Sequence, residues 1–234
     1  MTNDIKSSLK AVNSRIALLA EQYGRNPEDI RLLAVSKTFP AGQIQLAYEA
    51  GQRAFGENYV DEALGKIETL AHLDIEWHYI GPIQSNKTRK IAEHFDWVHS
   101  VASMKHARRL SEQRPADLPP VNVCIQVNIS GETSKSGIDR SEVAEFASTV
   151  IDLPGLRLRG IMGIPAPSTE LTMQRKAFAS LASIYMELKK SHEGIDTLSM
   201  GMSGDMEAAI AEGTTMVRIG TAIFGSRHTG KKPE

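Results

Sequence analysis

The stretch RLLAVSKTFPAGQIQLAYEAGQRAFGENY, residues 31–59, sets the pattern of the whole chain. It opens with a short apolar run, continues with a segment of helical spacing that starts near Ala41, and closes with a second short apolar run. Two strands separated by a helix pair in parallel through a right-handed crossover. The stretch therefore predicts a β–α–β unit whose first strand ends at Ser36, Lys37 and Thr38.

The same alternation repeats along the chain. The candidate strands are residues 31–38, 53–59, 75–81, 97–101, 121–129, 156–164, 197–203 and 216–225. The candidate helices between them begin near Ala41, Val60, Asn86, Met104, Arg140, Thr172 and Asp205. Eight is the number of strands that closes a TIM barrel, and no early strand is followed by the GxGxxG loop of a doubly wound dinucleotide-binding sheet. We therefore expect an α/β fold, a single (β/α)8 TIM-type barrel.

The segment before the barrel, residues 1–24, is predicted to form an extra N-terminal helix. Its apolar residues recur at helical spacing along one stripe, which comprises Ile5, Leu9, Val12, Ile16, Leu19 and Ala20. No Ser- or Gly-rich linker and no break in composition interrupts the chain, so we expect one domain over residues 1–234. The polar end, residues 229–234, is predicted to be a flexible tail.

Composition and charge limit the partners of the protein. Hydrophobic residues make up 41% of the chain and charged residues 24%, as in ordinary globular proteins. With a net charge of −1, the chain has no excess of positive charge to bind nucleic acid. No segment is long enough to cross a membrane. The single cysteine, Cys124, lies in an apolar run, and the N-terminus has no signal-peptide core. We therefore expect a buried thiol and a cytoplasmic protein. The histidines do not have the spacing of metal ligands, so we expect no metal site.

Lys37 is the most informative candidate for chemistry. Active groups in TIM barrels lie at the carboxyl ends of the strands, and Lys37 directly follows an apolar run that is predicted to be buried. Partial desolvation lowers the pKa of a lysine and makes its neutral, nucleophilic amine more available. The alternative is a lysine at the barrel rim that pairs with a carboxylate.

A second group of candidates follows the last two strands. Ser203 is expected to cap the helix after the seventh strand, and Gly204 lets the backbone approach a ligand closely. Gly220 and Thr221 follow the eighth strand, and barrels often bind phosphate in these two loops. The residues therefore predict a phosphate cup, with ordinary helix capping and a tight turn as the alternative.

Two more polar side chains are predicted to lie inside the barrel. Arg218 alternates with Val217 and Ile219, so it points inward if its neighbours face the helices. A buried arginine needs a partner, either a structural carboxylate or a ligand atom. His78 is flanked by Trp77 and Tyr79, and we interpret it as a hydrogen-bonded core residue, with a general base as the alternative.

Six motifs, in order, resemble the pyridoxal phosphate homeostasis proteins, also called the proline-synthetase co-transcribed family. The motifs are LLAVSKTFP (32–40), FGENYVDEALGKI (55–67), WHYIGPIQSNK (77–87), GIMGIPAP (160–167), LSMGMSGDMEAAI (198–210) and VRIGTAIFGSR (217–227). The family is similar to the barrel domain of alanine racemase standing alone. The resemblance therefore implies a barrel of fold type III that binds pyridoxal 5′-phosphate (PLP).

The resemblance implies that Lys37 binds PLP covalently as a Schiff base. Asn58 matches a residue beside the pyridoxal ring, and Arg218 matches an arginine that faces the pyridine nitrogen. The positions that match the phosphate cup are Ser203, Gly220 and Thr221. Gly204 stands next to this cup, where many relatives carry an acidic residue, and it keeps the backbone N–H groups that a phosphate uses.

An arginine donor leaves the pyridine nitrogen unprotonated, which makes the ring a weak electron sink. The similar alanine racemases share this arginine, but they add a second base. That base is a tyrosine supplied by a C-terminal β-domain and a dimer partner. This chain ends at Glu234, and we expect neither addition. The main hypothesis is a non-catalytic, monomeric protein of intracellular PLP homeostasis that holds the cofactor and modulates its supply to PLP-dependent apo-enzymes.

Two alternatives stay open. The first is a PLP-dependent enzyme similar to an amino-acid racemase, with Lys37 exchanging protons. The second is a barrel enzyme that binds a phosphorylated metabolite through the same phosphate cup without PLP. The sequence offers no acid–base pair for this second alternative.

Overall fold

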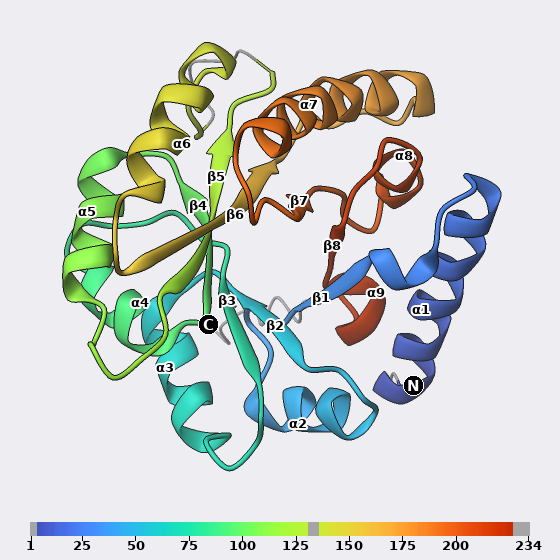
Figure 1. The fold of residues 1–234 in the computed structure, drawn as a ribbon. Coiled ribbons are helices and arrows are strands. Elements are labelled where there is room, and N and C mark those ends of the chain that lie inside the picture. Colours follow the sequence, from blue (N-terminus) through green and yellow to red (C-terminus); the bar gives the residue numbers. More distant parts are fainter. Residues whose placement is uncertain (1–3, 131–135, 227–234) are drawn as a thin grey trace, which may run out of the picture.

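The eight predicted strands form a closed parallel barrel in chain order (Figure 1). The computed structural model describes residues 4–130 and 136–226. Its strands are β1 (Arg31–Val35), β2 (Ala54–Glu57), β3 (Glu76–Tyr79), β4 (Trp97–Val101), β5 (Val121–Val127), β6 (Leu156–Gly163), β7 (Thr197–Ser199) and β8 (Met216–Ile219). β1 pairs with both β2 and β8, which closes the ring and confirms the predicted barrel.

Helices surround the strands in Figure 1. They are α1 (Ile5–Gln22), α2 (Ala41–Glu49), α3 (Val60–Thr69), α4 (Thr88–His94), α5 (Met104–Gln113), α6 (Val143–Ile151), α7 (Leu171–Ser191), α8 (Met206–Ala211) and α9 (Thr221–Phe224), with short 3-10 turns at Pro27–Asp29 and Arg140–Glu142. α1 is the predicted extra helix, and its apolar stripe is buried. It packs against α9 and α8. The tail predicted at residues 229–234 lies outside the described residues.

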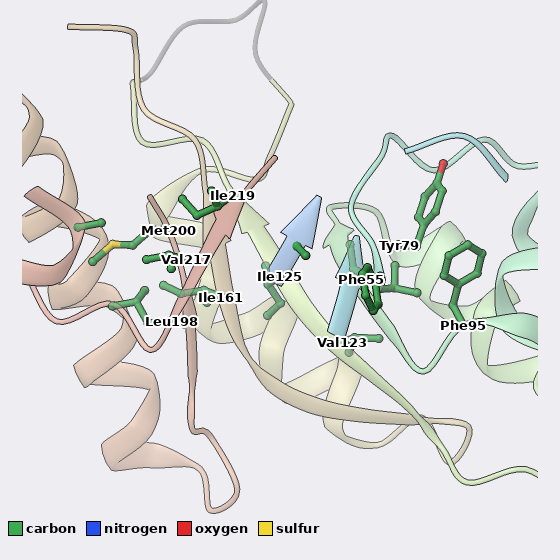
Figure 2. Close-up of a cluster of buried hydrophobic side chains, with 14 of the residues drawn as sticks. Phe55, Tyr79, Phe95, Val123, Ile125, Ile161, Leu198, Met200, Val217 and Ile219 are labelled. Atoms are coloured by element: carbon green, nitrogen blue, oxygen red, sulfur yellow. The ribbon is translucent and has the colours of Figure 1, made fainter. Parts of the chain in front are cut away.

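The main apolar core lies between the strands and the helices. Strand side chains alternate between the two faces of a sheet, and the outward ones meet the helices in one large cluster. Figure 2 draws part of this cluster, with Val217 and Ile219 on β8 and Tyr79 beside Phe95, whose ring centroids are 5.3 Å apart. Because Val217 and Ile219 face outward, Arg218 between them faces the barrel interior.

The interior of the barrel holds smaller apolar clusters. One comprises Leu33, Ala54 and Met216, and the other comprises Trp97, Cys124 and Met162. Cys124 is fully buried, as predicted, and burial raises the pKa of its thiol to about 12. The thiol is therefore protonated and unreactive at neutral pH. No helix in residues 4–130 and 136–226 is both long enough and apolar enough to cross a membrane.

Two local predictions in the last part of the barrel are wrong. Ser203 is not the cap of the following helix, because α8 begins at Met206 with Asp205 at its N-cap. The carboxylate of Asp205 accepts a hydrogen bond from the backbone N–H of Met202 at 2.5 Å, so the chain completes a turn before the helix starts. β7 ends early because Gly201 has a φ of +94°, a conformation that interrupts a strand.

The eighth strand is also shorter than predicted. It ends at Ile219, and the apolar run that follows Gly220 forms the short helix α9 instead of extending the strand. Phe224 on this helix stacks on Phe39, with ring centroids 5.1 Å apart. A short apolar run does not distinguish a buried strand from a buried helical turn, which explains the error.

Candidate functional site

All seven predicted cofactor residues line one cavity of about 290 Å³ at the carboxyl ends of the strands. These residues are Lys37, Asn58, Ser203, Gly204, Arg218, Gly220 and Thr221. The other lining residues are Val35, Phe39, Ile80, Met162, Ile164, Met202 and Gly225. The cavity therefore combines an apolar wall with a few polar groups, as small-molecule sites in barrels do.

Lys37 is half-buried and lies in a tight turn directly after β1. The next residue, Thr38, has a φ of +71°, a conformation that is rare for residues other than glycine. The backbone N–H of Thr38 donates a hydrogen bond to Glu62 Oε1 at 2.6 Å, and that of Phe39 donates to the carbonyl of Ser36 at 3.1 Å. A strained backbone conformation of this kind persists only where surrounding contacts hold it. Here Glu62 on α3 supplies the contact.

A buried charge network lies behind this turn. Lys66 Nζ lies 2.8 Å from Glu57 Oε1 and 2.6 Å from Glu62 Oε1, and it also donates to the carbonyl of Ser36 at 2.9 Å. The hydroxyl of Ser36 donates to Glu57 Oε1 at 2.6 Å. Burial raises the pKa of Glu57, and the charge of Lys66 opposes this change. The network thus ties the ends of β1 and β2 to α3.

Sequence reasoning missed this network. The sequence alone assigns no role to Glu57 or Lys66. The available signal was the i,i+4 spacing of Glu62 and Lys66 on one helix face. Their contact with Glu57, at the end of a separate strand, depends on how the helix packs on the barrel.

Asn58 contributes an unsatisfied polar atom to the cavity. Its Oδ1 is buried and has no hydrogen-bond partner among the described residues. A buried acceptor without a partner costs about 1–3 kcal/mol, which a ligand donor recovers. This atom therefore fits a site built to hold a polar ligand.

Arg218 is buried on β8, and both of its hydrogen bonds go to neutral oxygens. Nη1 donates to Ser199 Oγ at 2.8 Å, and Nη2 donates to the carbonyl of Gly163 at 3.2 Å. Among the described residues no carboxylate lies within ion-pair distance of Arg218, so a structural carboxylate is not its partner. Burial lowers its pKa to about 10, so the guanidinium stays charged at neutral pH.

The phosphate cup predicted from the sequence is a pair of turns. Ser203 and Gly204 lie between β7 and α8, while Gly220 and Thr221 join β8 to α9. A Cβ atom at Gly220 would lie 3.0 Å from the carbonyl oxygen of Val35, so glycine allows the close approach of the two chain segments here. The cup is thus made mainly of backbone.

His78 does not line the cavity. It is fully buried inside the barrel, where Nε2 lies 2.5 Å from Glu76 Oε1 and Nδ1 lies 2.9 Å from His99 Nε2. Its ring stacks on Trp97 with centroids 5.3 Å apart. The structure therefore agrees with its interpretation as a hydrogen-bonded core residue.

Comparisons with known proteins point to one family. The family model for the alanine racemase N-terminal domain matches residues 7–228. The pyridoxal phosphate homeostasis protein of Escherichia coli is 55% identical over 98% of this chain and 100% of its own length. The protein of the same name from Pseudomonas aeruginosa is 57% identical, with 97% of each chain covered.

Solved structures give the same result. PipY of Synechococcus elongatus, solved with PLP bound, is 39% identical, with a TM-score of 0.78 over 90% of this chain and 100% of PipY. A protein of Bifidobacterium adolescentis is 38% identical, with a TM-score of 0.87 over 95% of each chain. Alanine racemase from Corynebacterium glutamicum is 18% identical, with a TM-score of 0.67 over 97% of this chain and 63% of the racemase, and this similarity concerns the fold alone.

Proposed function

Because the chain belongs to the family of pyridoxal phosphate homeostasis proteins, we propose that it binds PLP in the cavity at the carboxyl ends of its strands. Lys37 holds the cofactor as a Schiff base, and the protein modulates the supply of PLP in the cytoplasm. The observation that carries this proposal is the arrangement of the cavity lining. One cavity brings together a lysine amine, a buried arginine and a backbone cup.

Each of these groups suits one part of PLP. The amine of Lys37 is the nucleophile that an aldehyde carbon requires. The backbone turns at Ser203–Gly204 and Gly220–Thr221 suit the phosphate, since barrels bind phosphate in these loops. The guanidinium of Arg218 is the donor for the pyridine nitrogen. The orphaned Oδ1 of Asn58 suits a hydroxyl donor beside the ring.

The lining also favours a carrier over a catalyst. Within the described part of the chain, Lys37 and Arg218 are the ionisable residues that line the cavity. Bound PLP supplies an electron sink for reactions at amino-acid substrates. A guanidinium that stays charged next to the ring nitrogen weakens that sink, and racemisation requires a second base on the opposite face. The described lining offers no such base.

Titration with PLP tests the proposal. After removal of free PLP by desalting, the wild-type protein is expected to keep a visible absorbance band, and Lys37→Ala to lose it. Lys90→Ala is the matched control, because Lys90 is an exposed lysine that pairs with Asp61 at 2.9 Å, outside the cavity lining. A wild-type protein that stays colourless, or a band that survives in Lys37→Ala, would contradict the proposal.

A racemase similar to alanine racemase is the second candidate function, favoured by the shared barrel domain. The two candidates differ in a direct assay. Incubation of the PLP-loaded protein with D- and L-amino acids is expected to show no turnover above free PLP. Turnover that disappears in Lys37→Ala would replace the carrier with an enzyme.

The alternative hypothesis, an enzyme that does not bind PLP, makes a different prediction. A barrel that acts on a phosphorylated metabolite binds phosphate esters through the cup and does not need Lys37. Phosphate-ester binding of equal strength in the wild type and in Lys37→Ala, with no PLP loading, would support it.

The carrier instead passes PLP to PLP-dependent apo-enzymes, so recovery of activity by such an apo-enzyme mixed with loaded protein is expected. Gel filtration is expected to give a monomer.

A further inference from the structure

Four polar side chains cross the interior of the barrel in a continuous line that ends at Arg218. We call them the interior row: Glu76, His78, His99 and Ser199. Glu76 Oε1 lies 2.5 Å from His78 Nε2. His78 Nδ1 lies 2.9 Å from His99 Nε2. His99 Nδ1 lies 3.2 Å from Ser199 Oγ, which accepts a hydrogen bond from Arg218 Nη1 at 2.8 Å.

When both imidazoles are neutral, the two ends of the row fix the direction of every hydrogen bond in it. Arg218 can only donate, and an ionised Glu76 can only accept. Ser199 accepts from Arg218 and donates its own hydrogen to His99 Nδ1. His99 then donates from Nε2 to His78 Nδ1, and His78 donates from Nε2 to Glu76. All four ring nitrogens and the hydroxyl of Ser199 have partners when both imidazoles are neutral and carry their hydrogen on Nε2.

Burial favours these protonation states. It lowers the pKa of His78, although Glu76 and Asp96 oppose this change. Burial and the charges of Arg218 and Arg31 lower the pKa of His99 well below its usual value. Burial raises the pKa of Glu76, but the hydrogen bond with His78 and the charge of Arg31 outweigh it and lower this pKa to about 2.

Rigid neighbours hold the row in place. The ring of His78 stacks on Trp97 with an angle of 11° between the planes, and Trp97 lies under Arg159, whose guanidinium carbon is 4.9 Å from the ring centroid. Glu76 is held by Arg31 at 2.7 Å. Side-chain hydrogen bonds that run in one direction polarise and strengthen one another. The row thus supports Arg218, the residue at which it meets the cavity.

We propose that the interior row orients the guanidinium of Arg218 toward the ring of PLP, which makes His78, His99 and Ser199 positioning residues. This inference rests on the proposed function, because it assumes that Arg218 faces the cofactor. The hydroxyl hydrogen of Ser199 is committed to His99, so its lone pairs face Arg218. This bond and the one to Gly163 fix the plane of the guanidinium. Arginine carries further N–H donors, which are then available to the cavity.

Substitutions at His99 separate positioning from simple packing. His99→Leu fills the space but removes both ring nitrogens, so Ser199 loses its acceptor. His99→Asn places an amide oxygen near the position of Nδ1 and restores that acceptor. We expect His99→Leu to weaken PLP binding about tenfold, the loss of one hydrogen bond to a charged group. We expect His99→Asn to bind within about twofold of wild type.

Cys124→Ala is the matched control, because Cys124 lies in the same interior and leaves the row intact. It is expected to bind PLP like the wild type. The absorbance band of bound PLP gives a readout that packing alone does not move. The band is expected to shift in His99→Leu and to return in His99→Asn. Equal affinity and equal spectra in wild type and His99→Leu would overturn the inference while the proposed function stands.

A measurement without PLP tests the row itself. Nitrogen-15 NMR of the unloaded wild-type protein is expected to show both imidazoles neutral, with hydrogen on Nε2 and bare Nδ1, between about pH 6 and 8. Hydrogen on Nδ1 of either ring would overturn the inference. If the row has these tautomers but the wild type takes up no PLP, the proposed function fails and the positioning role fails with it. The NMR arm needs no variant to fold.

Discussion

The two sides of the cavity are built in different ways. On the side of Lys37, the ends of β1 and β2 are held by the buried charges of Glu57 and Lys66. On the side of the phosphate cup, the chain turns on glycines, with Gly201 in a left-handed conformation and Gly220 against the carbonyl of Val35. One side is thus fixed by side chains and the other by backbone.

The difference matches what each side has to do under the proposed function. A lysine that forms a covalent bond must have its amine held in one place, so the support behind it is a network of side chains. A phosphate is recognised by backbone N–H groups, so the cup requires turns that expose them. Stability and binding are therefore expected to depend on different residues on the two sides.

The largest effect is expected from breaking the charged side. Lys66→Met leaves Glu57 buried without its partner, which should cost about 3–5 kcal/mol in free energy of unfolding. Urea denaturation measures it. The control is Lys90→Met, which breaks an exposed ion pair with Asp61 and should change stability by less than about 1 kcal/mol. Equal losses in both variants would mean that the buried network does not hold this side.

The backbone side is expected to respond to a single methyl group. A Cβ atom at Gly201 would lie 2.5 Å from the Cβ of Ala209, at a φ of +94°. Gly201→Ala should therefore cost about 1–3 kcal/mol of stability, measured by thermal unfolding. Gly204→Ala is the comparison, because apart from its two chain neighbours no described residue lies within 4 Å of its added Cβ.

Gly204→Ala should leave stability within about 0.5 kcal/mol of wild type. Under the proposed function it should also leave PLP binding close to that of wild type, because it keeps the backbone N–H groups that a phosphate uses. A large loss of PLP binding in Gly204→Ala would mean that the cup requires glycine at this position. This pair of variants separates a position where the fold requires glycine, Gly201, from one where a side chain is tolerated, Gly204.

A smaller effect is expected from pH. In Lys66→Met, the buried Glu57 keeps the burial that raises its pKa and loses the cation that opposed it. The neutral carboxyl is then favoured in the folded state, so its contribution is present at low pH and lost as pH rises through the raised pKa. The stability deficit of Lys66→Met should therefore shrink as the pH is lowered through the raised pKa of Glu57. A deficit independent of pH would argue against an unpaired Glu57.

Local pattern predicted much of this molecule, and long-range contacts account for what it missed. The strand ends that carry Lys37, Asn58 and Arg218 follow from strand–helix alternation and the rule that barrel sites lie at carboxyl ends. The helical turn at Thr221–Phe224 was missed because a short, mostly apolar run fits either type of element.

The hydrogen-bond partners were missed for a different reason. His78 and His99 are 21 residues apart in sequence, and His99 and Ser199 are 100 residues apart. They meet because barrel closure brings β3, β4, β7 and β8 around one interior. The spacing of residues within a single sequence does not indicate such long-range contacts.

The central claim is that Lys37 forms the covalent bond to PLP. Reduction of the loaded protein with borohydride, followed by digestion and mass spectrometry of the peptides, tests it most directly. The account predicts a phosphopyridoxyl group on the peptide that contains Lys37. A label on other lysines with Lys37 unmodified would contradict it.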